Sequence, residues 1–270
     1  MKTRFPKMTG LMLTLMILLL LSACGADDKS NSKGEAKPDS GDADKMMEIS
    51  VAVVNDFPPF EFIDGDELTG FDIDIIEAIA SKVNIEVDWK IMKFDGIVPA
   101  LQAKQVEAAV SAIGITDERL EVVDFSDTYF ESGLALTVHI DSEIASEEDL
   151  EGKLLVAKQG TSSLIKANEL AEKYNGKVKV LQDDVSLYME VELGNSDAMI
   201  NDFPSVAYKL KKDGDDAEMK ILGEPLTGEN YGIAIVKDND ELVERLNRGL
   251  KELRDSGEYE EIFDKYFSTK

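Results

Sequence analysis

Apolar and polar residues alternate along some stretches of the chain and follow helical spacing along others. Order is expected to begin near Glu48, where every second residue up to Val53 is apolar, as in a half-buried strand. After a turn through residues 55–60, apolar residues from Asp72 to Val83 recur at the spacing of one helix face. A second alternating run, Ile85–Ile91, predicts another strand. The chain therefore starts with the order strand, loop, helix, strand.

The same order returns later in the chain. The further elements expected are a helix from about Asp95, strands Ala108–Ser111 and Leu154–Ala157, and a helix from about Ser162. Near the C-terminus, Tyr231–Val236 is expected to be a strand followed by two helices, the first with a stripe of leucines at helical spacing: Leu242, Leu246, Leu250 and Leu253. Strands that alternate with helices predict an α/β fold with parallel sheets.

The N-terminus indicates export. Three basic residues (Lys2, Arg4 and Lys7) precede an apolar run from Leu11 to Leu21, which is too short for a spanning helix and fits a signal peptide over residues 1–23. The sequence Leu21-Ser22-Ala23-Cys24 resembles the bacterial lipobox, in which the cysteine is acylated and becomes the new N-terminus.

Cys24 is the only cysteine, so no intrachain disulfide is possible. We expect its lipid, palmitate among others, to anchor the protein at the outer face of the cell membrane, in an extracytoplasmic location. Residues 24–46 are mostly small, charged or polar and predict a flexible linker.

Composition limits the classes of function. With 55 acidic and 29 basic residues the chain has a formal net charge of −26, which disfavours nucleic acid as a partner. The 270 residues are enough for two lobes. The one histidine, His139, lies in the apolar stretch 134–140 and is interpreted as a strand residue. No serine-hydrolase elbow, phosphate-binding glycine loop or His/Cys cluster is present, so we expect no catalytic residue, cofactor or metal.

Three segments have the residues needed to bind a charged ligand. In residues 111–119, small residues are followed by Arg119, whose guanidinium suits a carboxylate; capping of a helix by a surface arginine is the alternative. Residues 158–163 pass through a glycine into a helix N-terminus with free N–H donors, or form an ordinary Ser/Thr cap. In residues 199–204, Asp202 follows a strand and would pair with an ammonium group or cap the next helix.

From about Glu48 to Phe267 the chain resembles the bacterial polar amino-acid-binding proteins of ABC importers, the family 3 solute-binding proteins that include the glutamine and lysine/arginine/ornithine binders. The stretches that carry the resemblance are Pro58-Pro59-Phe60-Glu61-Phe62, Gly70-Phe71-Asp72-Ile73-Asp74, Pro99-Ala100-Leu101-Gln102, Ile115-Thr116-Asp117-Glu118-Arg119, Asp124-Phe125-Ser126 and Tyr231-Gly232-Ile233-Ala234. In this sequence Asp72 and Asp74 are interpreted as helix-start residues.

The resemblance implies a two-lobed periplasmic-binding-protein fold of type II, in which each lobe is a sheet flanked by helices. Lobe 1 would comprise residues 47–129 and 231–270, lobe 2 residues 134–226, and the hinge residues 130–133 and 227–230. It also implies a monomer that binds a small molecule, a polar amino acid, and delivers it to an ABC importer permease. A sensor module for a separate signalling partner and a dehydratase on the same fold remain as alternatives.

The resemblance also assigns the ligand-binding residues. Arg119 would hold the ligand's carboxylate with backbone N–H groups near Gly114 and Ser162, and Asp202 would hold its ammonium group with Ser111 or Ala112. The rest of the expected site comprises Phe57 and Phe94 around the side chain, Thr161, and the selecting residues Lys158 and Asn201.

The charges expected around the ligand's side chain favour glutamine. Val54 stands where glutamine and basic-residue binders often have an acid, and Gly114 stands where many relatives have a hydroxyl. The charge of Lys158 would repel a basic ligand. We therefore expect glutamine first, then glutamate.

Overall fold

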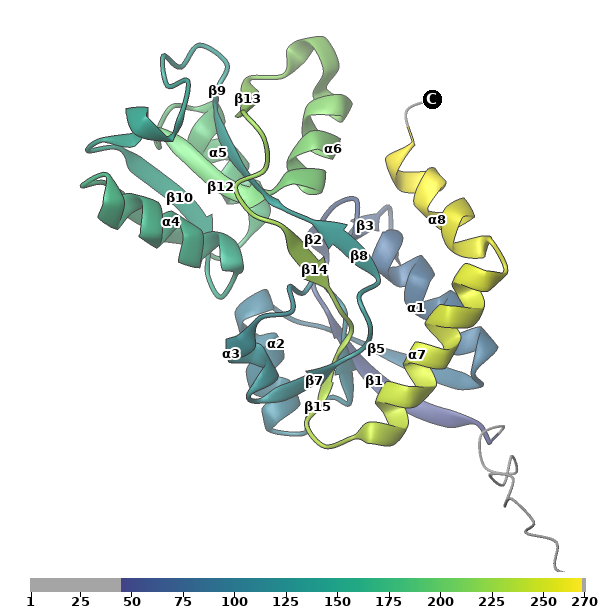
Figure 1. Ribbon diagram of the computed structural model, residues 1–270. Helices are drawn as coiled ribbons and strands as arrows, with labels where there is room; N and C mark the ends of the chain where they lie inside the picture. The colour runs from purple at the N-terminus through teal and green to yellow at the C-terminus, as the bar shows by residue number, and fades with distance from the viewer. Residues whose placement is uncertain (1–44, 269–270) are drawn as a thin grey trace, which may run out of the picture. The chain divides into compact units, whose positions relative to one another are not determined.

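The computed structural model describes residues 45–268, all of which belong to one contact unit, Ser40–Lys270. A first five-stranded sheet has the order β5-β1-β6-β15-β7 (Figure 1). Its strands are β1 (Met47–Val53), β5 (Ile85–Ile91), β6 (Ala108–Ala109), β7 (Val123–Phe125) and β15 (Ala234–Val236). β1 pairs in parallel with β5 and β6, whereas β15 is antiparallel to both β6 and β7.

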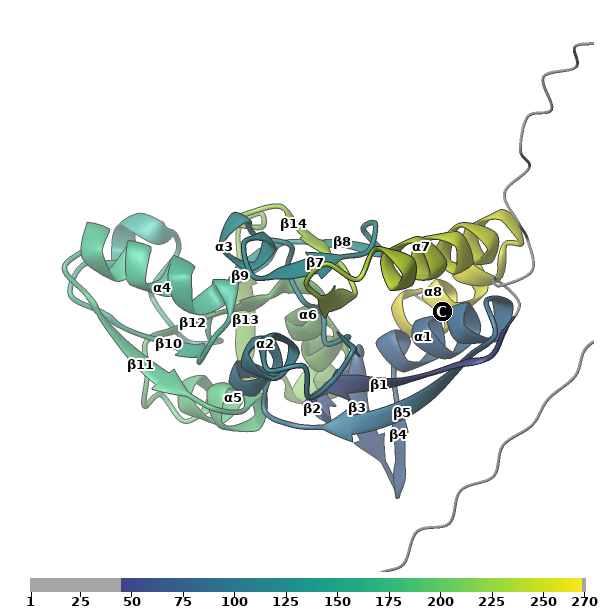
Figure 2. The same cartoon turned by 90° about the horizontal axis from the view of Figure 1, so that it is seen from below.

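Helices cover both faces of this sheet. They are α1 (Phe71–Lys82), α2 (Phe94–Gln102), the one-turn helix α3 (Asp117–Leu120), α7 (Asp240–Asp255) and α8 (Glu258–Phe267). α1, α7 and α8 contact one another and lie together in Figure 2, while α2 contacts β1, β6, β7 and β15. The four leucines of the predicted stripe on α7 are all buried. A three-stranded meander of β2 (Asp56–Phe57), β3 (Glu61–Asp64) and β4 (Glu67–Thr69) precedes α1.

A second five-stranded sheet has the order β11-β10-β12-β9-β13. Its strands are β9 (Leu134–His139), β10 (Leu154–Lys158), β11 (Lys177–Leu181), β12 (Ala198–Asp202) and β13 (Met219–Leu222). The helices around it are η1 (Glu147–Leu150), α4 (Ser162–Lys173), α5 (Asp184–Glu192), α6 (Phe203–Asp213) and η2 (Gly214–Asp216). One apolar cluster packs α4 against this sheet, and a second cluster packs α5 and α6 against it. His139 is a half-buried strand residue, in agreement with its interpretation from the sequence.

Two short strands connect the sheets along the chain. β8 (Phe130–Ser132) leads from the first sheet into the second, and β14 (Glu229–Tyr231) leads back. They pair antiparallel, with Glu229 opposite Ser132 and Tyr231 opposite Phe130 (Figure 1).

The structure corrects three details of the sequence-based prediction. Both sheets are mixed rather than parallel, because β15 and β9 run against their neighbours. The predicted strand Ala108–Ser111 pairs only over Ala108–Ala109. The predicted strand Tyr231–Val236 is divided into the end of β14 and β15, since Gly232 and Ile233 pass between two sheets. At Gly232 a Cβ atom would lie 2.9 Å from Cδ1 of Ile115, so this crossing has no room for a side chain.

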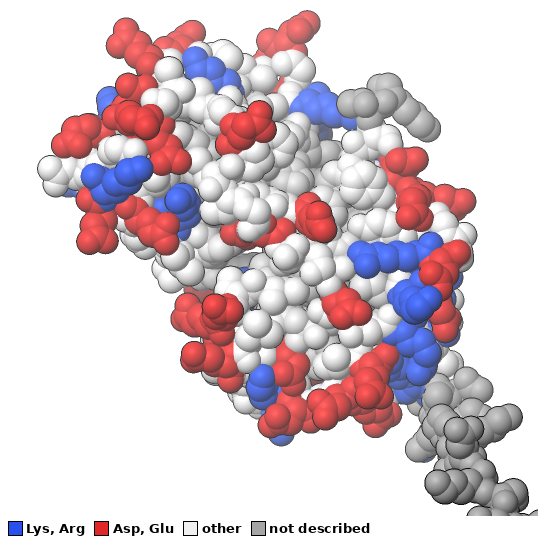
Figure 3. Space-filling view, viewed as in Figure 1, with Lys and Arg blue, Asp and Glu red and all other residues white. Residues whose placement is uncertain are grey.

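The predicted signal peptide, Cys24 and the linker up to residue 44 lie outside the described residues. Within residues 45–268, no helix is both long and apolar enough to cross a membrane. Acidic side chains are spread widely over the face seen in Figure 3, in keeping with the net charge.

Candidate functional site

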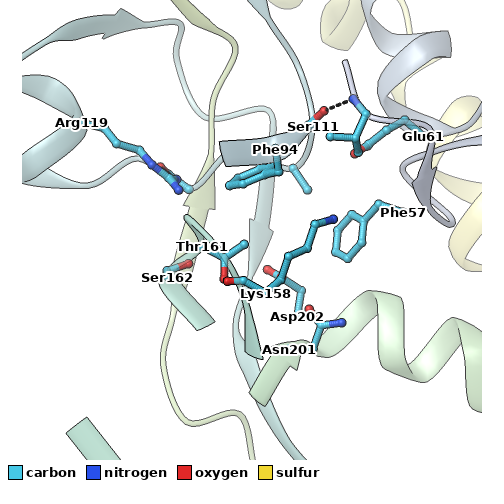
Figure 4. Close-up of a pocket in the computed structure, with 13 residues that line it drawn as sticks. Phe57, Glu61, Phe94, Ser111, Arg119, Lys158, Thr161, Ser162, Asn201 and Asp202 are labelled. Carbon is cyan, nitrogen blue, oxygen red and sulfur yellow. Dashed lines mark hydrogen bonds between the residues drawn. The ribbon is translucent and has the colours of Figure 1, made fainter. Parts of the chain in front are cut away.

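One cavity brings together all eleven residues that the sequence predicted to bind a ligand (Figure 4). They are Phe57, Phe94, Ser111, Ala112, Gly114, Arg119, Lys158, Thr161, Ser162, Asn201 and Asp202. Val54 and Glu61 complete the lining. The side chains come from segments before β8 and from segments between β8 and β14, so both sheets contribute to the wall.

Arg119 provides the positive charge at one side of the cavity. It lies on the one-turn helix α3, which Thr116 caps by accepting a hydrogen bond from the Arg119 N–H (3.2 Å). Its Nη1 donates to the Gly114 carbonyl (2.7 Å), its Nη2 donates to the Gly160 carbonyl (3.0 Å), and its guanidinium lies 5.5 Å from the centre of the Phe94 ring. Burial lowers the pKa of Arg119, and nearby carboxylates oppose that shift. The guanidinium has five N–H donors, so those left over remain for a carboxylate.

The N-terminus of α4 faces the same part of the cavity. Thr161 caps this helix by accepting from the Leu164 N–H (3.2 Å), so the ordinary cap considered from the sequence is present. The neighbouring Ser162 hydroxyl instead donates to the carboxylate of Glu229 (2.8 Å). Free N–H groups and the helix dipole make this a favourable place for an anion.

Asp202 provides a buried negative charge at the end of β12. It occupies the N-cap position of α6, but its side chain makes no capping hydrogen bond. Its carboxylate accepts a hydrogen bond from the Tyr231 hydroxyl instead. Burial raises the pKa of Asp202 to about 7, and the Tyr231 hydrogen bond acts in the opposite direction. A ligand ammonium group beside it would favour the ionised form.

Lys158 is not the free ammonium that the sequence suggested. Its Nζ forms a buried ion pair with Asp184 and lies 3.7 Å from the carboxylate of Asp56. Burial alone would lower the pKa of Lys158, but these two carboxylates outweigh burial and raise it. Asn201 also donates to Asp184 (3.0 Å), so the two predicted selecting residues share one partner. The positive charge of Lys158 is therefore compensated within the protein.

Glu61 is the main residue of the cavity that sequence reasoning missed. It is fully buried, and neither carboxyl oxygen has a hydrogen-bond partner among residues 45–268. Burial raises its pKa well above the ordinary value, and the nearby Asp72 carboxyl adds to that shift. The sequence feature that could have pointed to Glu61 is its position as an acid between two aromatic residues, Phe60 and Phe62, in the strand after the turn.

Asp72 supports the cavity from behind. It stands in the first turn of α1, as predicted, and it also accepts hydrogen bonds from the Ala112 N–H (2.7 Å) and the Tyr129 hydroxyl (2.9 Å). Ala112 has a φ of 45°, a left-handed conformation that is unfavourable for a residue with a Cβ. The buried hydrogen bond from the Ala112 N–H to Asp72 therefore stabilises the bend that carries Ser111 to Gly114 along the cavity.

Residues 49–269 match the model of the bacterial extracellular solute-binding proteins, family 3. The chain belongs to this family. Among curated relatives, the ABC transporter glutamine-binding protein GlnH of Bacillus subtilis (strain 168) is 31% identical over 269 residues, which cover 94% of each chain. A solved structure of an ancestral arginine-binding protein bound to arginine has a TM-score of 0.78 at 38% identity and covers 82% of this chain and 98% of that one.

A further solved structure is the ancestral amino acid-binding protein AncCDT-1, a precursor of cyclohexadienyl dehydratase (TM-score 0.75, 33% identity, 82% of this chain and 96% of that one). The matches confirm the predicted fold class, two lobes that are each a sheet flanked by helices. Family membership supports an amino acid as ligand, an ABC transporter as partner and a location outside the cytoplasm. The family and these relatives are binding proteins, and the dehydratase lineage shows that the fold also supports an enzyme.

Proposed function

We propose that this protein captures a polar amino acid in the cavity and delivers it to an ABC importer. The observation that carries the proposal is the placement of one partly buried cation, Arg119, and one buried carboxyl group, that of Asp202, on the wall of a single cavity. The α-carboxylate would bind Arg119 with N–H groups near Gly114 and Ser162. The α-ammonium would bind Asp202 with Ser111 or Ala112. A buried zwitterion needs both charges paired, because an unpaired buried charge is costly.

The two anchors also suggest how the ligand would act on the protein. Arg119 belongs to the proposed lobe 1 (47–129 and 231–270) and Asp202 to the proposed lobe 2 (134–226). The proposed hinge, residues 130–133 and 227–230, would overlap strands β8 and β14. A ligand that contacts both lobes stabilises the arrangement in which both contacts exist together. The importer would then recognise the liganded form.

Glutamine is the first candidate for the side chain. Phe57 and Phe94 line the cavity and would cover the aliphatic part of the ligand, and the Asn201 amide would serve its polar end. The relative GlnH is named a glutamine-binding protein.

A basic amino acid is the second candidate, because of Glu61. A buried carboxyl without a hydrogen-bond partner is unusual and suits a cationic group brought by a ligand. The pairing of Lys158 with Asp184 and Asp56 also weakens the repulsion that spoke against a basic ligand. One of the solved structures matched is described as bound to arginine.

A panel of the twenty amino acids, measured by calorimetry on the full-length protein in detergent, tests the proposal. We expect one or a few polar amino acids to bind and apolar ones to fail. Glu61→Gln distinguishes the candidates, since it would strongly lower the affinity for a basic ligand and leave the affinity for glutamine nearly unchanged. Glu67→Gln, an exposed acid on β4, is the matched control. The proposal is wrong if no amino acid binds.

We further propose that the mature protein is held at the outer face of the membrane by an acylated Cys24. The support is the N-terminal sequence, with its basic residues, apolar run and lipobox-like end. Replacement of Cys24 with alanine should move the protein from the membrane fraction to the soluble fraction. Retention of a processed Cys24→Ala protein in the membrane fraction would contradict the anchor.

A further inference from the structure

Strand β14 directs two side chains toward the two anchors of the proposed site. Alternate residues of a strand point to the same side, so Glu229 and Tyr231 share a face, and Asn230 between them is exposed. Tyr231 donates its hydroxyl hydrogen to Asp202, the proposed ammonium anchor. Glu229 accepts a hydrogen bond from Ser162, beside the proposed carboxylate anchor.

The carboxylate of Glu229 lies in the space above Gly114. A methyl group placed on Gly114 would be 3.2 Å from Oε2 of Glu229, 3.5 Å from Nη1 of Arg119 and 3.8 Å from the hydroxyl of Ser162. These three side chains therefore surround one small volume. Arg119 and Ser162 are also the groups proposed to hold the carboxylate of the ligand.

The charges agree with this geometry. Glu229 is the first of the carboxylates that hold up the pKa of the partly buried Arg119. In turn, burial raises the pKa of Glu229, while Ser162 and Arg119 act against that shift. The protein thus already places one carboxylate near the Arg119 guanidinium. The carboxylate of the ligand would need that same guanidinium.

We propose that Glu229 stands in for the ligand's α-carboxylate and competes with it for Ser162 and Arg119, so that it limits the affinity of the site. This inference rests on the proposed amino-acid function and deepens it. A ligand with an α-carboxylate must displace the Glu229 side chain or accept a like charge beside it. Glu229 then lowers the affinity for the zwitterion and keeps Arg119 neutralised when no ligand is bound.

The presence of a glycine at position 114 agrees with this competition between Glu229 and the ligand. A Cβ at this site would come within 3.2 Å of Glu229, which is closer than ordinary contacts. Glycine therefore leaves room for the Glu229 carboxylate where many relatives, by the resemblance noted above, have a hydroxyl-bearing residue.

The test compares two ligands on matched variants of the full-length protein. The ligands are the tightest-binding amino acid and its α-carboxamide, which has no negative charge at that end. Glu229→Gln keeps a hydrogen-bond acceptor for Ser162 but removes the charge. We expect Glu229→Gln to increase the affinity for the amino acid about tenfold, because like charges at a binding site are costly and the charge of Glu229 is partly screened by solvent. The affinity for the α-carboxamide should change less than about twofold.

Two further variants control for charge and folding. Glu131→Gln removes an exposed charge from β8, the strand paired with β14, and should leave both affinities unchanged. Glu229→Asp keeps the charge but withdraws it on a shorter side chain, and it should also tighten binding of the amino acid, by less than about tenfold, so the inference can still be tested if Glu229→Gln folds poorly.

Equal or weaker amino-acid binding by Glu229→Gln would overturn the inference, as would an equal gain for the amino acid and its carboxamide. Neither result would affect the proposed function. If neither the wild-type protein nor any variant bound an amino acid, the proposed function would fail, and this inference with it.

Discussion

The raised pKa of Asp202 predicts that ligand affinity falls as the solution becomes acidic. Burial raises this pKa from an ordinary 3.8 to about 7, so the carboxylate is about half ionised at neutral pH. The ammonium group of an amino acid requires the ionised form. Affinity should therefore level off near pH 8, below the pH at which the ligand's ammonium group loses its own proton, and fall about tenfold for each pH unit below 7, to about one hundredth at pH 5. That difference corresponds to about 2.7 kcal/mol of binding free energy.

Calorimetry in buffers of different ionisation enthalpy measures both the affinity and the protons exchanged. Binding at pH 7 should release about half a proton per ligand, and the release should approach zero near pH 8. Other groups near Asp202 also titrate or carry charge, namely Tyr231, Glu229, Asp184 and Lys158. The comparison with Asp202→Asn isolates the contribution of Asp202, because the variant should bind weakly at every pH and show a much flatter profile. A wild-type affinity that stays constant from pH 5 to pH 8 would refute the reasoning.

Three other substitutions have expected outcomes. Arg119→Ala should weaken amino-acid binding about 30-fold or more, while Arg248→Ala, at an exposed site, should not change the affinity measured by calorimetry. Lys158→Ala should lower the free energy of unfolding by about 3 to 5 kcal/mol, as measured by chemical denaturation, because it leaves Asp184 buried without its ion-pair partner. Burial raises the pKa of Asp72 from 3.8 to about 6, so its contribution to stability is fully present below pH 4 and is lost as the pH rises through 6. Denaturation at several pH values should therefore show Asp72→Asn gaining about 3 kcal/mol relative to wild type between pH 3 and pH 7.

Elements with a clear local pattern were predictable from the sequence. The strand Ile85–Ile91 has the predicted bounds, since its alternation reflects one partly buried face. The helix predicted from about Ser162 begins at that residue, because Thr161 supplies a strong N-cap signal. The break in Tyr231–Val236 was not predictable, since the close approach of Ile115 to Gly232 comes from a distant part of the chain.

The grouping of the site residues was also predictable, because the resemblance to a known family supplied positions that local patterns do not. The hydrogen-bond and ion-pair partners of these residues were not predictable. Lys158 pairs with Asp184, 26 residues further along, and Ser162 pairs with Glu229, 67 residues away. Neither acid stands in a motif that indicates the contact. The charge state of a buried group depends on such partners, so the argument from an unpaired Lys158 could not have been corrected without the structure.

The position of β15 in the first sheet has a consequence for how the protein is made. This strand lies between β6 and β7, yet it comes more than 100 residues after them in the chain. Until residue 236 has been synthesised, β6 and β7 each lack a neighbour, and their open edges cannot complete the sheet. The N-terminal half therefore cannot reach its final fold while the chain is still growing. Because both edges stay open until β15 is present, a truncation before Ala234 should yield an aggregation-prone product.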